Sequence, residues 1–179
     1  GKAQGLAALA RAGFPVPPAF ALHSSVFDET VASVLAPDER PEGLARGGAQ
    51  ADFAARLERI RAIVRRAPLP PALLDELRHA RAELERGGAC GLAVRSSSTL
   101  EDQGFASGAG LHTSILHVTS DEALEAAVRE CWASLFEPRV LTYATSHRAR
   151  RAPSMGVVIQ QLVVAETAGA MFTMNPLTG

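Results

Sequence analysis

The feature that most constrains the fold is a change of hydrophobic period at the glycine pair Gly87-Gly88. Before it, apolar residues within 53–64 and 73–84 step by three or four positions, which is the period of amphipathic helices. After it, Leu92-Ala93-Val94 is a short continuous apolar run, which is typical of a buried strand. A chain with both periods predicts an α+β fold, with a small mixed sheet packed with several helices.

Glycine, proline and capping residues mark where the other elements begin and end. Gly13 is expected to end a first helix that begins at Lys2, because glycine tolerates the left-handed backbone found after helices. Ser24 and Ser25 are the expected caps of a later helix that ends before Pro37. The remaining expectations are strands at 19–22, 92–94 and 114–118, an exposed connection at 38–48, helices at 121–136 (capped by Ser120) and 139–147, and two paired strands at 157–164 and 168–173.

Chemistry is expected where the strand at 92–94 runs into a polar passage, residues 95–102. This passage holds an arginine, four consecutive hydroxyl side chains and two carboxylates, and buried polar groups need partners. The guanidinium of Arg95 is a planar, permanent cation that suits phosphate oxygens. Alternatively, Arg95 pairs with Glu101 or Asp102 and the hydroxyl groups satisfy a turn. Spacing alone leaves both interpretations open.

Two weaker signals accompany this passage. A lysine in the first turn of a helix opposes the helix dipole, so Lys2 indicates a bound anion, with a solvated lysine as the alternative. Glycines at 104, 108 and 110 permit close approach of the backbone to a ligand, or mark only a turn. The Gly-Lys-Ser/Thr order of a Walker motif is absent from the sequence.

Charge and cysteine content exclude several classes of function. The 179 residues carry 18 basic and 19 acidic side chains for a net charge of -1, without a single-sign block that would bind nucleic acid or a membrane surface. Apolar runs stay well short of the ~20 residues that a membrane span needs. Cys90, Cys131 and the five scattered histidines lack metal-ligand spacing. We therefore expect a cytoplasmic protein without a nucleic-acid or membrane partner and without metal ligands of its own.

Six blocks of the sequence follow one another in the order of a known family. They are residues 1–6, 13–20, 94–102 (Val-Arg-Ser-Ser-Ser-Thr-Leu-Glu-Asp), 131–136 (Cys-Trp-Ala-Ser-Leu-Phe), 157–160 (Val-Val-Ile-Gln) and 171–179 (Met-Phe-Thr-Met-Asn-Pro-Leu-Thr-Gly). The chain resembles the N-terminal PEP/pyruvate-binding domain of phosphoenolpyruvate synthase, pyruvate phosphate dikinase, rifampin phosphotransferase and the plant glucan dikinases. The resemblance spans nearly the whole chain and is least specific between residues 37 and 88.

The resemblance implies an ATP-grasp-like domain that loads phosphate from ATP onto a histidine of another domain, which carries it to pyruvate or another acceptor. Lys2 and Arg95 would grip the ATP phosphates and would be the catalytic residues. Gly110 and Ser114 would lie in the loop over the nucleotide, and Gln160 would contact the nucleotide near its base or hinge. Cations that offset charge are what phosphoryl transfer needs. The implied cofactors are ATP and Mg²⁺, with the magnesium ligands outside this chain.

The same resemblance implies an incomplete domain. Residues 1–179 would be its N-terminal portion, with a helical insertion at 37–88, while its second half and the phosphohistidine domain lie outside the sequence. We expect the chain alone to be inactive and its parent to be a phosphoenolpyruvate synthase-like enzyme. A relative that phosphorylates rifampin or a glucan, or a non-catalytic nucleotide-binding or regulatory module, stays open because acceptor specificity resides elsewhere.

Overall fold

The protein is built on an antiparallel sheet with the strand order β1-β4-β2-β3. The computed structural model describes residues 1–47, 52–88, 90–99, 113–146 and 152–169. The strands are β1 (Ala19–Leu22), β4 (Met155–Gln161), β2 (Leu92–Ser98) and β3 (Ser114–Val118). The α+β prediction is confirmed. The three pairings of these strands are all antiparallel, which differs from the mixed sheet that was expected.

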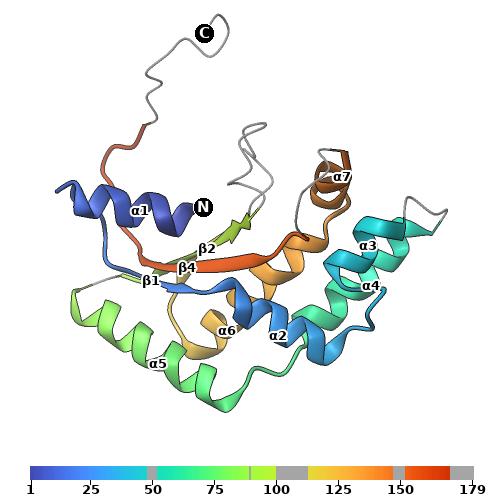
Figure 1. The fold of residues 1–179 in the computed structure, drawn as a ribbon. Coiled ribbons are helices and arrows are strands. Elements are labelled where there is room, and N and C mark those ends of the chain that lie inside the picture. Colours follow the sequence, from blue (N-terminus) through green and yellow to red (C-terminus); the bar gives the residue numbers. More distant parts are fainter. Residues whose placement is uncertain (48–51, 89, 100–112, 147–151, 170–179) are drawn as a thin grey trace, which may run out of the picture.

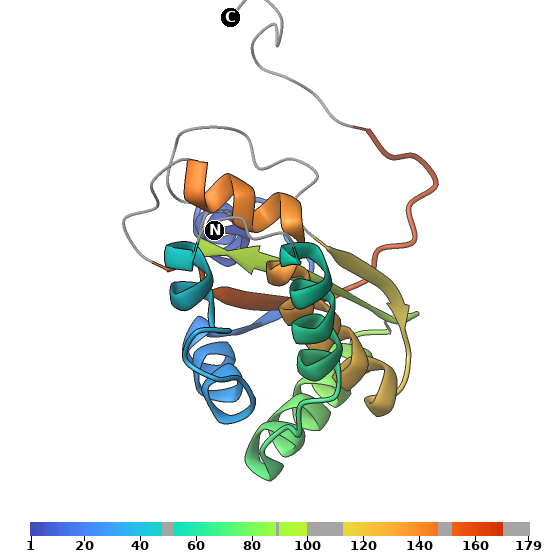
Figure 2. The same ribbon diagram turned by 90° about the vertical axis from the view of Figure 1, so that its right-hand side faces the viewer.

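The two faces of the sheet are covered unequally. Figures 1 and 2 show α1 (Lys2–Arg11) on one face and α2, α5 and α6 on the opposite face. We call these the α1 face and the core face. The helices after α1 are α2 (Ser24–Val34), α3 (Pro41–Gly47), α4 (Phe53–Arg65), α5 (Pro71–Arg86), α6 (Asp121–Ala133), the 3-10 turn η2 (Ser134–Phe136) and α7 (Pro138–Ser146).

The hydrophobic core lies between the helices and the core face of the sheet. Val94 of β2 and Ile159 of β4 are fully buried there. They share the core with Phe27 of α2 and Trp132 of α6, whose rings meet edge to face with centroids 6.2 Å apart. The ring centroid of Phe136 also lies 6.2 Å from that of Phe27. Trp132 is therefore a core residue, as its place on an amphipathic helix predicts.

Local sequence sets the ends of the helices. Gly13 follows α1 and has a positive φ of 82°. The N–H of Gly13 donates to Ala10 O at 3.1 Å, and the N–H of Phe14 donates to Leu9 O at 3.1 Å. This pair of bonds is a Schellman ending, so the expected glycine stop is confirmed. Ser120 accepts from Ala123 N–H at 3.1 Å and caps α6, also as expected.

The cap of α2 differs from the prediction. Ser24 and Ser25 lie inside the first turn, and the residue that caps the helix is His23. Its ring Nδ1 accepts from Ser25 N–H at 3.2 Å. An imidazole nitrogen thus satisfies the backbone donor that a serine hydroxyl was expected to satisfy.

Two other expectations need correction. Residues 38–48 do not form a fully exposed connection, because they contain α3, and Leu44 of that helix is only 3% exposed. The expected pairing of 157–164 with 168–173 falls partly outside the described residues, at 170–173, but both edges of β4 are already paired, with β1 and with β2. The chain leaves the sheet after Gln161, and Val163 and Val164 are exposed.

None of the helices within the described ranges combines the length and the apolar character needed to cross a membrane.

Candidate functional site

The polar passage that begins at Arg95 is part of the sheet, so its side chains alternate between the two faces. β2 was expected to end at Val94 but continues to Ser98, because β4 pairs with it along its whole length. Side chains of successive strand residues point to opposite faces. Val94 belongs to the core, and Arg95 and Ser97 therefore lie on the α1 face.

The strands beside β2 extend the α1 face on both sides. Arg95 lies directly opposite Val158 of β4 and Ser114 of β3. Residues directly opposite each other in antiparallel strands share a face. Val158 packs beside α1, which fixes the face, and Ser114 is exposed on it next to Arg95. The expected site residues Arg95 and Ser114 thus lie together.

Lys2 is bound to β2 at the two residues that follow Arg95. Its backbone N–H donates to Ser97 Oγ at 3.0 Å, and its Nζ donates to the Ser96 carbonyl at 2.9 Å. The first of these bonds satisfies one of the backbone donors that a helix start leaves unpaired. Lys2 and Arg95, which are 93 positions apart in sequence, are therefore brought to one segment of one strand.

Arg95 is held by a neutral partner. Its Nη1 donates to Gln160 Oε1 at 3.3 Å, and within the described ranges no carboxylate forms an ion pair with it. Glu101 and Asp102, the alternative partners considered from sequence, lie outside the described residues. Other arginines of the described ranges do pair with carboxylates: Arg56, Arg61, Arg65, Arg78, Arg81, Arg86, Arg129 and Arg139.

Gln160 lies on the α1 face of β4 and is 6% exposed. Besides accepting from Arg95, it donates through Nε2 to the carbonyl of Pro17 at 3.2 Å. Gln160 thus lies beside Arg95 and Pro17 in the structure. Gly110, the remaining expected site residue, lies outside the described residues.

The hydroxyl side chains within 95–102 bind different partners, and the sequence pattern did not distinguish them. Ser96 is fully buried, donates to the Thr113 carbonyl at 3.1 Å and accepts from Thr113 N–H at 2.9 Å, so it joins β2 to the start of β3. Ser97 instead binds Lys2. Strict alternation from Arg95 could have assigned Ser97 to the site and Ser96 to the interior.

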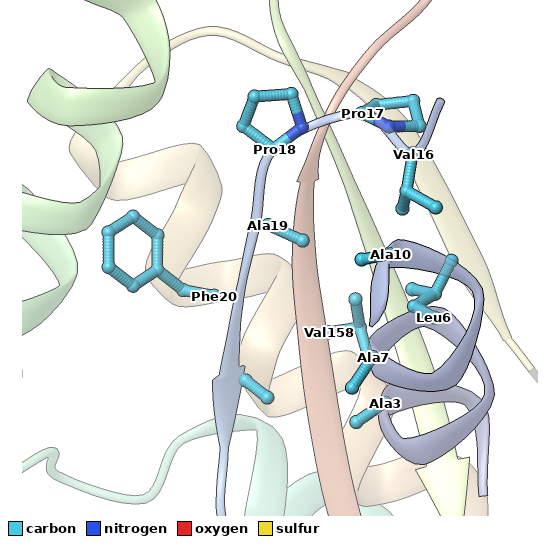
Figure 3. Close-up of a pocket in the computed structure, with 11 residues that line it drawn as sticks. Ala3, Leu6, Ala7, Ala10, Val16, Pro17, Pro18, Ala19, Phe20 and Val158 are labelled. Carbon is cyan, nitrogen blue, oxygen red and sulfur yellow. The ribbon is translucent and has the colours of Figure 1, made fainter. Parts of the chain in front are cut away.

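An apolar groove of about 320 Å³ runs along the α1 face beside these residues. Figure 3 shows small side chains of α1, among them Ala3 and Ala7, across from Val158 and the turn at Pro17 and Pro18. Pro17 thus lines the groove, and its carbonyl accepts from Gln160. Hydrogen bonds therefore connect the groove to Gln160 and, through Gln160, to Arg95.

The described ranges contain no group of three or more His, Cys, Asp or Glu residues that could hold a metal ion. Cys131 is buried and Cys90 is exposed, and both are free thiols.

Comparison with protein families shows which family this chain resembles. The model described as "Pyruvate phosphate dikinase, AMP/ATP-binding domain" matches residues 1–179. The chain belongs to this family. The resemblance inferred from the six sequence blocks is thereby confirmed, and the α1 face with Lys2 and Arg95 is a feature of an AMP/ATP-binding domain.

Curated relatives match the whole chain of this AMP/ATP-binding domain at similar identities. The prodigiosin synthesizing transferase PigC of Serratia marcescens is 36% identical, and the chain covers 18% of it. The phosphoenolpyruvate synthase of Aeropyrum pernix is 35% identical, with 23% of it covered, and a rifampicin phosphotransferase of Streptomyces sp is 35% identical, with 21% covered. The chain thus spans roughly a fifth of the length of these relatives.

Proposed function

We propose that the α1 face binds the phosphates of ATP, with Arg95 and Lys2 as the cations that grip them. The observation that carries this proposal is that the partner of Arg95 within the described ranges is a neutral amide, whereas several other arginines there, such as Arg65 and Arg81, pair with carboxylates. A partly buried cation that keeps its charge is suited to an incoming anion.

Lys2 supports the same proposal through its position. The bonds to Ser96 and Ser97 hold it on the strand that carries Arg95. From this position Lys2 is proposed to offer a second positive charge to the same polyphosphate. Phosphoryl transfer is accelerated mainly by positioning and by such charges.

Ser114 and Gly110 complete the proposed nucleotide site. The hydroxyl of Ser114 is exposed beside Arg95, where it can donate to a phosphate oxygen. Gly110 is proposed for the loop over the nucleotide by family resemblance alone. Mg²⁺ would supply further charge neutralisation on the phosphates when bound, with ligands outside the residues described.

For the protein as a whole, we propose a cytoplasmic phosphotransferase that converts pyruvate to phosphoenolpyruvate. A histidine of another domain would carry the phosphoryl group between the two substrates. Phosphorylation of rifampicin or of a glucan is a second candidate, favoured by the rifampicin phosphotransferase being as similar as the phosphoenolpyruvate synthase. Acceptor choice is proposed to lie outside the AMP/ATP-binding domain.

The first experiment measures ATP binding by calorimetry for the protein and for Arg95→Ala. A hydrogen bond to a charged group contributes about 1.5–3 kcal/mol, so we expect affinity to fall about tenfold or more. Arg86→Ala is the control, because Arg86 lies at the exposed end of α5 and pairs with Glu83. Unchanged affinity in Arg95→Ala would contradict the assigned phosphate site.

The second experiment decides the acceptor. The complete protein is incubated with ATP, Mg²⁺ and either pyruvate or rifampicin, and phosphorus NMR follows the products. We expect phosphoenolpyruvate from pyruvate and no phosphorylated rifampicin. Transfer to rifampicin without phosphoenolpyruvate would establish the second candidate, and ATP binding without transfer to any acceptor would favour a regulatory module.

A further inference from the structure

The side chain of Gln160 uses both ends of its amide inside the fold. Its Oε1 accepts from Arg95 and its Nε2 donates to Pro17 O. A guanidinium can only donate and a carbonyl can only accept, so exchanging the amide oxygen and nitrogen would break both bonds. The orientation of the amide is therefore fixed by its partners.

We propose that Gln160 is a positioning residue for Arg95 and makes no direct contact with the nucleotide; this inference rests on the proposed phosphate-binding role of Arg95. Gln160 is only 6% exposed, and the two ends of its amide are directed at Arg95 and at Pro17 O, which leaves little of the side chain open to a nucleotide. The amide instead connects Arg95 to the Pro17 turn that lines the groove. Its role thus differs from the nucleotide contact expected from the family resemblance.

The chemistry of an amide explains why this position suits glutamine. A glutamate of the same size would also accept from Arg95, but its negative charge would neutralise the guanidinium and repel the phosphates of ATP. It would also place a carboxylate oxygen against the carbonyl of Pro17 in place of a donor. A neutral acceptor fixes the direction of the guanidinium while its charge stays available to a ligand.

A double-mutant cycle between Gln160 and Arg95 tests the proposal. We expect Gln160→Met, which removes both bonds at similar volume, to weaken ATP binding about threefold to tenfold, the range of one ordinary hydrogen bond. In the Arg95→Ala background, Gln160→Met should cause no further loss, because its effect passes through Arg95. Equal losses in both backgrounds would overturn the proposal.

Inorganic tripolyphosphate gives a readout that a merely structural role would not move. It carries the phosphates without a base, so Gln160→Met should weaken its binding by the same factor as that of ATP. Unchanged tripolyphosphate binding with weakened ATP binding would indicate contact with the base and would refute the positioning role.

Two more variants keep the test decisive if Gln160→Met proves unstable. Gln160→Glu preserves the size of the side chain and should weaken ATP binding at least as much as Gln160→Met. Wild-type affinity of Gln160→Glu would contradict the need for a neutral acceptor beside Arg95. Gln161→Met is the matched control, since Gln161 donates to Gly87 O and should leave ATP binding unchanged. If the unmodified protein binds neither ATP nor tripolyphosphate, the proposed function itself fails, which is a distinct result.

Discussion

The two cysteines show how strongly environment separates residues of one type. Cys131 of α6 is fully buried, with its Sγ 3.9 Å from the carbonyl of Val94. Burial raises the pKa of its thiol to about 12, and the neighbouring Glu130 carboxylate acts in the same direction while Lys2 opposes it. Cys90 is exposed. Because the thiolate is the reactive form, the two thiols should differ greatly in reactivity.

Titration of the native protein with an aromatic disulfide reagent at pH 8 should therefore modify Cys90 rapidly and Cys131 only after denaturant is added. The Cys90→Ser variant isolates the buried thiol and should show no fast phase. A fast phase of full amplitude in that variant would mean that the packing of α6 against β2 opens readily.

At the scale of elements, the residues that start and end each helix were the most predictable part of the fold. Gly13 and Ser120 act where local sequence places them, because a helix end needs only neighbours along the chain. β2 was predicted too short because its extension through Ser98 depends on pairing with β4, some 60 positions away. Leu44 was missed for the same reason, since the burial of a short helix is set by distant partners.

The candidate site also has a part that local sequence predicts and a part that depends on distant segments. Arg95 could be predicted because a cation at the end of an apolar strand is costly without a partner. The bond from Gln160 to Pro17 spans 143 positions, and local sequence carries no sign of it. Likewise, the docking of Lys2 on Ser97 could not be derived from spacing, because it joins the first helix to a strand far along the chain.

The docking of α1 onto the sheet can be tested at its first residue. α1 contains no buried residue, and its start is held by the bond from Lys2 N–H to Ser97 Oγ. Loss of a capping hydroxyl costs about 1 kcal/mol. We expect Ser97→Ala to accelerate hydrogen exchange of the α1 amides about fivefold, leaving α6 unchanged.

Ser120→Ala is the matched control for this prediction, because it removes the same kind of cap from α6. Its effect should appear in α6 or in global stability and not selectively in α1. If Ser97→Ala leaves exchange in α1 at the wild-type rate, α1 is anchored chiefly by its small apolar side chains over Val158.

For the whole molecule, the unequal covering of the sheet predicts that stability and the proposed nucleotide binding depend on residues of opposite faces. The core face is stabilised by packed helices and by ion pairs between them, such as Arg65 of α4 with Glu130 of α6 at 2.7 Å and Arg81 of α5 with Asp121 of α6 at 2.7 Å. The α1 face carries Lys2 and Arg95, the cations proposed to bind the phosphates of ATP. Substitutions on the core face should therefore change unfolding more than nucleotide binding, and those on the α1 face the reverse.

The Arg65–Glu130 pair makes the stability of the whole molecule depend on pH in a predictable direction. The hydrogen bond from Arg65 holds the pKa of Glu130 below its ordinary value of 4.5, although partial burial acts in the opposite direction. A carboxyl group with a lowered folded-state pKa stabilises the fold above its unfolded-state pKa, and this contribution is lost as pH falls through the folded-state pKa. The side chains of Arg65 and Glu130 are 33% and 36% exposed, so solvent screens their interaction. The contribution of the pair to the free energy of unfolding is therefore limited to about 1 kcal/mol.

Glu130→Gln should therefore lower the free energy of unfolding by up to about 1 kcal/mol at pH 7. The difference from the unmodified protein should persist down to about pH 5 and shrink below pH 4.5, because protonated Glu130 then carries no more charge than glutamine. Urea denaturation at pH 7, 5 and 3.5 measures this difference. Glu83→Gln, which removes an exposed pair with Arg86, should change stability little at any of these values. If the difference in the free energy of unfolding instead grows as pH falls, Arg65 does not stabilise the ionised carboxylate of Glu130. The packing of α4 against α6 would then depend on their apolar contacts alone.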